Sequence, residues 1–216
     1  MPGGPQVACV GLDASLADLV ADGVHSALSG LDMAADLDRL VVCADDLAGA
    51  GEAWVQPARG TRGRALTLYC HPEVFLAARP AAAAGLPSAV WEQAGPAAAE
   101  AQVAAGDFSR SRAEVFLYHE LLVIRDLLRR ELDPSRVPAT LAEAFAAAWS
   151  IGVDGRLARA GLPGYPLAER RRRFSRLFSQ AGILMPEHWT IFQEIWDGVA
   201  AQQRDVARLA RRLPRL

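Results

Sequence analysis

The chain has 216 residues, of which 51% are hydrophobic and 22% charged, and this length is enough to bury one substantial core. Its formal net charge of −2 gives no overall attraction to nucleic acid or to an anionic membrane, so we expect neither as a partner. Three widely spaced cysteines, no basic leader and no long uncharged apolar run lead us to expect a cytoplasmic protein with free thiols.

The first part of the chain predicts one helix followed by three strands. Apolar residues recur at helical spacing after Asp13, and Gly30 is a suitable end for that helix. Three apolar runs with strand-like alternation follow, at Arg39–Ala44, Gly51–Pro57 and Arg64–Cys70. The glycine-rich segment between the last two runs suits a hairpin turn, so we expect those two strands to be antiparallel.

The second part of the chain predicts helices. Helical periodicity fills 111–132, 138–161, 166–182 and 185–213, whereas residues 71–109 show no clear pattern. The expected fold class is α+β: an N-terminal helix, a small three-stranded and mainly antiparallel sheet, then a mostly helical C-terminal half. We expect a single domain over 1–216, with a core at about 39–161 and the helices of 166–213 packed on it.

The helix over 111–132 carries the residues that suggest chemistry. It is apolar nearly all round, so we expect it to be buried. Arg112, His119 and Asp126 nevertheless fall on one polar stripe at helical spacing, and buried polar groups need partners. Glu120 directly follows His119, and Glu143 lies on the next predicted helix, 24 residues after His119.

This arrangement resembles the gluzincins, the thermolysin-like metallopeptidases. In that family a helix bears His-Glu-x-x-His, and a following helix supplies a Glu as third zinc ligand at about the spacing of Glu143 from His119. The order of strands before the helix is also similar to the minimal zincin core, and the similarity covers about residues 39–161. The resemblance implies zinc ligands at His119 and Glu143, with Glu120 in the position of the general base.

The sequence departs from the family pattern at Val123, which stands where the second histidine belongs. A valine side chain cannot bind a metal, and catalytic zinc sites use three protein ligands. The resemblance therefore implies a degenerate site, in which His119 and Glu143 are the remnant of a metal centre. Arg112, Asp126 and Asp154 are candidates for residues that surround this remnant and hold its ligands in position.

The arginine cluster in Glu169–Arg176 allows two interpretations. Arginines bind phosphate well. Phe174 and Leu177 supply an apolar side to this helix, so we predict that the arginines form its solvated face.

The function that these observations favour is that of a degenerate metallopeptidase-like domain without proteolytic activity, needing no cofactor. It would bind or regulate an unknown protein or peptide, with the groove beside the sheet edge as the candidate site. Three alternatives stay open. The chain could be an active zinc metalloenzyme with a rewired metal site, a non-enzymatic interaction module that uses its C-terminal helices, or an unrelated α+β domain.

Overall fold

The computed structural model describes residues 4–45, 53–57, 64–77, 107–179 and 183–214. They divide into two compact units, residues 1–26 with 37–113 and residues 27–36 with 114–216. The α+β fold class is confirmed. The assignment of 1–216 to one domain stays a prediction, as does the packing of the sheet on the helix that bears His119.

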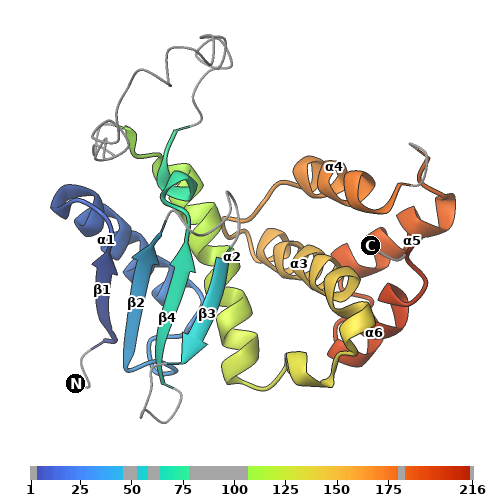
Figure 1. The fold of residues 1–216 in the computed structure, drawn as a ribbon, viewed down its shortest axis with the longest axis horizontal. Helices are drawn as coiled ribbons and strands as arrows, with labels where there is room; N and C mark the ends of the chain where they lie inside the picture. Colours follow the sequence, from blue (N-terminus) through green and yellow to red (C-terminus); the bar gives the residue numbers. More distant parts are fainter. Residues whose placement is uncertain (1–3, 46–52, 58–63, 78–106, 180–182, 215–216) are drawn as a thin grey trace, which may run out of the picture. The chain divides into compact units, whose positions relative to one another are not determined.

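The described part of the first unit contains a four-stranded sheet in the order β1-β2-β4-β3 (Figure 1). Its strands are β1 (Gln6–Val10), β2 (Arg39–Ala44), β3 (Ala53–Pro57) and β4 (Ala65–Cys70). The antiparallel pairing of β3 with β4 is confirmed. The hairpin turn expected between these strands lies outside the described residues.

The expectation of three mainly antiparallel strands was wrong in number and direction. Strand β1 was not predicted, and β2 is parallel to both β1 and β4. For the pairing of β1 with β2 the reason is the helix α1 (Ala14–Gly30), which connects these two strands. A helical crossover returns the chain to the same end of the sheet, so the two strands that it joins are parallel.

The alternation predicted for β2 and β4 appears as a row of buried pairs across the two strands. Leu40 is paired with Leu66 and Val42 with Leu68, and all four side chains are buried. Residues between them point to the opposite face, because side chains alternate along a strand. On β3 and β4, Trp54 stacks on Tyr69 with ring centroids 5.1 Å apart. The sheet is therefore buried most completely along one face.

The second unit is helical. Its described helices are α2 (Arg110–Leu128, of which the first turn belongs to the first unit), α3 (Ala142–Arg159), α4 (Leu167–Phe178), α5 (Pro186–Trp196) and α6 (Gln203–Ala210). The last predicted helix is split in two, because Gly198 has a φ of +80° and ends the helical path after α5. None of the described helices combines the length and the apolarity that crossing a membrane requires.

Helix α3 packs closely against α5. A Cβ atom added at Gly155 of α3 would overlap the main-chain carbonyl group of Trp196 at the end of α5. One turn earlier, a Cβ at Gly152 would meet Ile195 Cγ2 at an ordinary 3.5 Å. The backbone of α3 therefore approaches α5 most closely at Gly155, next to the buried Asp154.

Candidate functional site

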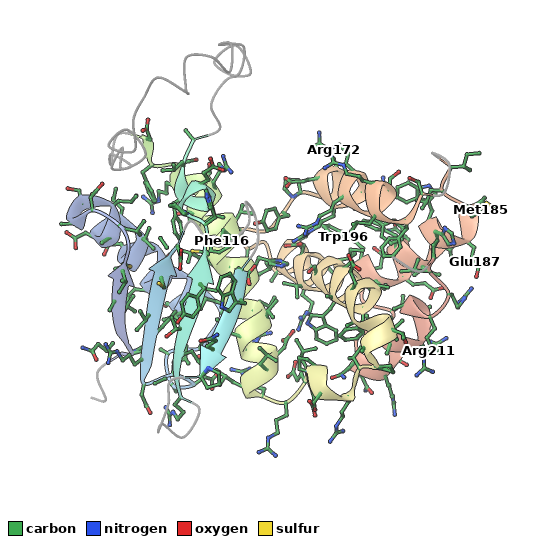
Figure 2. All side chains as sticks on the ribbon, in the orientation of Figure 1. Phe116, Arg172, Met185, Glu187, Trp196 and Arg211 are labelled. Atoms are coloured by element: carbon green, nitrogen blue, oxygen red, sulfur yellow. The ribbon has the colours of Figure 1, made fainter. Side chains whose placement is uncertain are left out.

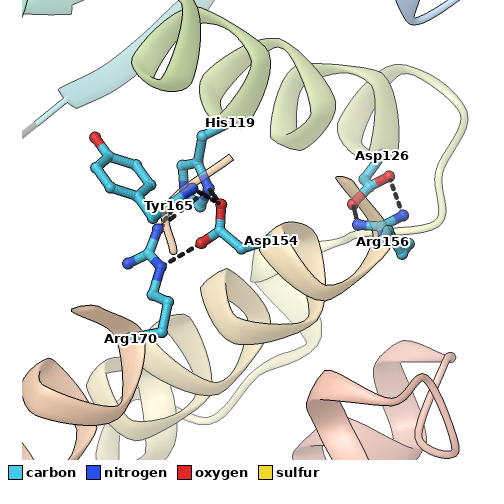
Figure 3. A network of polar contacts seen from close by, with 6 residues as sticks. All are labelled: His119, Asp126, Asp154, Arg156, Tyr165 and Arg170. Carbon is cyan, nitrogen blue, oxygen red and sulfur yellow. Dashed lines mark hydrogen bonds and ion pairs between the residues drawn. The ribbon is translucent and has the colours of Figure 1, made fainter. Parts of the chain in front are cut away.

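Two carboxylates, Asp126 on α2 and Asp154 on α3, are fully buried in the second unit (Figure 3). A buried carboxylate is costly unless hydrogen bonds and opposite charge compensate it. Each of the two is surrounded by donors from other segments. Two polar clusters thus join the helices α2 and α3.

The first group, here called the His119 cluster, consists of His119, Asp154, Tyr165 and Arg170. His119 Nδ1 lies 3.0 Å from Asp154 Oδ1, and the main-chain N–H of Tyr165 donates to the same oxygen at 3.1 Å. Arg170 Nε donates to the other carboxylate oxygen, Oδ2. His119 and Arg170 are each only 5% exposed. Three donors therefore satisfy the Asp154 carboxylate.

The guanidinium of Arg170 also lies against the imidazole. Its Nη2 is 3.2 Å from His119 Nδ1 and 3.4 Å from Nε2. Its carbon Cζ lies 4.4 Å from the centre of the Tyr165 ring, a cation–π distance. The Tyr165 ring in turn meets the His119 ring edge-on, with centroids 5.3 Å apart. Arg170 is thus enclosed by a carboxylate, an imidazole and a phenol ring (Figure 3).

The contact with Asp154 favours one tautomer of His119. An acceptor oxygen 3.0 Å from Nδ1 favours a proton on that nitrogen, since two lone pairs would otherwise face each other. Neutral His119 then carries its lone pair on Nε2. The imidazole is positioned by the carboxylate in the way that metal-binding and catalytic histidines are positioned.

The second group surrounds Asp126. Arg156 Nη1 donates to Asp126 Oδ1 at 2.9 Å, its Nη2 donates to Oδ2, and Trp149 Nε1 donates to Oδ2 at 3.1 Å. Arg156 also lies over the Trp149 ring, 5.7 Å from its centre. Both carboxylate oxygens therefore accept hydrogen bonds from α3. This group is a paired arginine–carboxylate bridge that fastens α2 to α3.

Two ionisable groups at the His119 cluster have raised pKa values. Burial raises the pKa of the Glu120 carboxyl above its ordinary range; the charges of His119 and Arg170 oppose this shift and that of Asp154 adds to it. Burial, aided by the charge of Glu120, raises the pKa of Tyr165 to about 12. The Tyr165 phenol is therefore neutral at physiological pH and cannot serve as a base there.

The structure brings together some of the predicted site residues and separates others. His119 and Asp154, expected as a ligand and a supporting residue, are in direct contact. Asp126 belongs to the separate group with Arg156. Arg112 is exposed and lies in the first unit. The relation of Arg112 to His119 stays a prediction.

Glu143, the expected third ligand, is not among the residues of the His119 cluster. It is exposed in the first turn of α3. Eleven residues separate it from Asp154, which corresponds to about 16 Å along the helix. Helix α3 begins after Leu141 without a side-chain cap. On α3 it is Asp154, not Glu143, that reaches the imidazole.

The residues present do not fit a catalytic zinc ion. One imidazole and one carboxylate face each other, the position one turn after His119 is Val123, and a guanidinium fills the space beside both donors. Within the described ranges, no group of three or more His, Cys, Asp or Glu side chains is arranged to hold a metal. Catalytic zinc needs three protein ligands, and a neighbouring cation would oppose it.

Arg170 is the site residue that sequence reasoning missed, since the arginines of Glu169–Arg176 were expected on a solvated face. Arg170 is buried, whereas Arg171, Arg172 and Arg173 are exposed, and Figure 2 shows Arg172 pointing outward from α4. A signal for it was available. Phe174 and Phe178 follow Arg170 at intervals of four residues and are buried on the same face.

A pocket of about 210 Å³ lies between α3 and α4, beside the His119 cluster. The α3 side is lined by small residues, Ala146, Ala147 and Ser150, with Glu143 at one end. Arg170, Arg173, Phe174 and Leu177 line the α4 side. The short side chains of α3 leave this space open, and its wall combines apolar groups with arginine.

Comparison with known proteins adds no relative. No family model matches the chain, and neither a curated protein nor a solved structure matches it.

Proposed function

We propose that the chain is a metallopeptidase-like domain without peptidase activity, whose role is to bind a peptide or protein. The observation that carries the proposal is the composition of the His119 cluster. Its imidazole is held by Asp154 in the orientation suited to a metal, but the next donor position on α2 is Val123. A hydrolytic zinc centre needs one ligand more than this arrangement offers.

Peptidase activity and metal content test this proposal together. The protein, purified without a histidine tag and dialysed against zinc, is expected to retain much less than one zinc per chain. It is also expected to leave a library of quenched fluorescent peptides uncleaved. One tightly bound zinc per chain with peptide cleavage, abolished by Glu120→Gln, would instead support the alternative of an active enzyme with a rewired metal site.

We assign the binding role to the pocket between α3 and α4. The charge of Arg170 is already compensated by Asp154, so exposed Arg173 is the cation available to a ligand there. The Ser150 hydroxyl lies on the opposite wall, and Phe174 and Leu177 provide apolar contact. This combination suits the C-terminal carboxylate of a peptide whose last residue is apolar, since arginine binds carboxylates in a forked geometry.

Labelled peptides test this location. Peptides with a free C-terminal carboxylate are expected to bind, and the same peptides with an amidated C-terminus are expected to bind at least tenfold more weakly. Arg173→Ala should remove the difference between the two series, whereas Arg172→Ala, which changes an arginine outside the pocket, should preserve it. Equal binding of acid and amide peptides to the unaltered protein would show that the pocket does not recognise the carboxylate.

A second candidate function is that of an interaction module using the C-terminal helices. Ile183 and Met185, just before α5, are 66% and 56% exposed, and Trp189 on α5 is 37% exposed. Exposed apolar residues that lie together often mark a protein contact. Association with a partner that is lost in Met185→Glu but kept in Arg173→Ala would favour this function over the pocket.

A further inference from the structure

We propose that the guanidinium of Arg170 takes the place of a metal ion between His119 and Asp154, so that an internal cation keeps this site closed to metals. The inference rests on the proposed function, because it takes the His119 cluster as the counterpart of a metallopeptidase centre. It goes further by assigning Arg170 a definite role: it positions the two donors and excludes a divalent cation.

The contacts of Arg170 support this assignment. One guanidinium nitrogen binds Asp154 Oδ2, and another lies 3.2 Å and 3.4 Å from the two ring nitrogens of His119. The single cation therefore lies against both the Asp154 carboxylate and the His119 imidazole. The side chain is only 5% exposed, so water cannot solvate its charge and a protein group must compensate it. The buried Asp154 carboxylate compensates that charge.

The position of Val123 makes the assignment testable. It lies one helical turn after His119, so its side chain projects from the same face of α2. A histidine there, with His119 and with Asp154 released from its contact with Nδ1, would give the three protein ligands of a catalytic-type zinc site. The substitution Val123→His alone is not expected to create that site, because the Arg170 cation would remain beside the donors and repel the metal.

The decisive comparison uses two double variants. Val123→His with Arg170→Ala removes the cation and leaves room for a metal. Val123→His with Arg170→Lys keeps a positive charge at the same position. We expect the alanine pair to bind one Co²⁺ with the visible absorption of a tetrahedral site, and to melt at a higher temperature with Zn²⁺. The lysine pair and Val123→His alone should show neither effect.

Folding of the alanine pair needs its own measurement, because Arg170→Ala leaves the buried Asp154 without its cation. The variant is refolded with Zn²⁺, with Mg²⁺ and with chelator, and its circular dichroism is recorded. Recovery of the native spectrum with Zn²⁺ only would support the inference, since a metal that binds the folded state stabilises it. Failure to recover under any of the three conditions would overturn it.

The remaining outcomes are also decisive. Metal binding by the lysine pair, or by Val123→His alone, would show that Arg170 does not exclude metal. If Val123→His with Arg170→Ala folds but binds no Co²⁺, the His119 cluster does not correspond to a metal site. Either result leaves the proposed function standing, whereas stoichiometric zinc with peptide cleavage in the unaltered protein would contradict the proposed function itself.

Discussion

His119 and Asp154 lie 35 residues apart in the sequence, yet Nδ1 of the imidazole is 3.0 Å from Oδ1 of the carboxylate. The contact joins the middle of α2 to the second half of α3. Both side chains are buried, and Arg170 completes the cluster from α4. Three helices of the second unit therefore meet at the Asp154 carboxylate. Their packing depends on the hydrogen bonds and the opposite charge that compensate this buried group.

Removal of the Asp154 charge should strongly destabilise the protein. Asp154→Asn leaves the buried Arg170 cation uncompensated, and breaking a buried ion pair in this way costs about 3–5 kcal/mol in the free energy of unfolding. Asp36→Asn is the control, because its ion pair with Arg129 is partly exposed and worth about 0–1 kcal/mol. Urea denaturation measures both. Equal losses of unfolding free energy in the two variants would show that the buried ion pair stabilises the protein no more than the exposed one.

Glu120→Gln should stabilise the protein in a pH-dependent manner. The folded state raises the pKa of Glu120, so it favours the protonated carboxyl. Below about pH 4, near the ordinary range of a Glu, both states are protonated and the glutamate incurs no penalty. As the pH rises from there towards the raised pKa, the unfolded state loses its proton while the folded state keeps it, so wild-type stability falls relative to the Gln variant.

Thermal melts of Glu120→Gln and the unaltered protein between pH 4 and 8 test this prediction. The melting temperature of the variant should exceed that of the unaltered protein by an amount that grows above pH 4 and levels off once the pH passes the raised pKa. Glu143→Gln, which removes an exposed carboxylate, controls for the loss of one negative charge. A difference that grows towards acid pH instead would mean that the ionised form of Glu120 is the stabilising one.

Gly155→Ala should disturb the helical unit far more than Gly152→Ala. The added methyl group at residue 155 would overlap the Trp196 carbonyl, so α3 and α5 would have to separate. The same change at residue 152 meets only an ordinary contact and gains helix propensity. We expect a loss of about 1–3 kcal/mol for the first variant and a gain or no change for the second. Chemical denaturation that ranks the two in the opposite order would contradict the described packing.

The strands of the first unit show what the sequence could predict. β2 matches its predicted bounds at Arg39–Ala44, and β4 differs by one residue, because alternating apolar side chains directly reflect one buried face. β1 was missed. Its pattern is short and only partly buried, and its pairing with β2 depends on the α1 crossover, which is a relation distant in sequence. The parallel pairing of β1 with β2 was missed with it, whereas that of β2 with β4 depends on β3 lying at the edge of the sheet.

The site was predictable only where its signal was local. His119 and Asp154 are polar residues within apolar helices, so their need for partners could be inferred. Which partner each takes depends on how α2, α3 and α4 meet, and no spacing along the chain determines this. The 24-residue interval favoured Glu143, whereas the contact is made by Asp154. Arg170 was hidden among four consecutive arginines, although its spacing to Phe174 marked the buried face.

The most direct test of the central claim is the state of the His119 ring in the unaltered protein. Long-range nitrogen–proton NMR spectra of ¹⁵N-histidine-labelled protein, with His119→Gln used to assign the signals, report the proton on each ring nitrogen. The account predicts a proton on Nδ1, held by Asp154, and His119 signals that stay unchanged when equimolar zinc is added. Zinc-induced displacement of the His119 Nε2 signal would contradict it, because the imidazole would then be open to a metal despite Arg170.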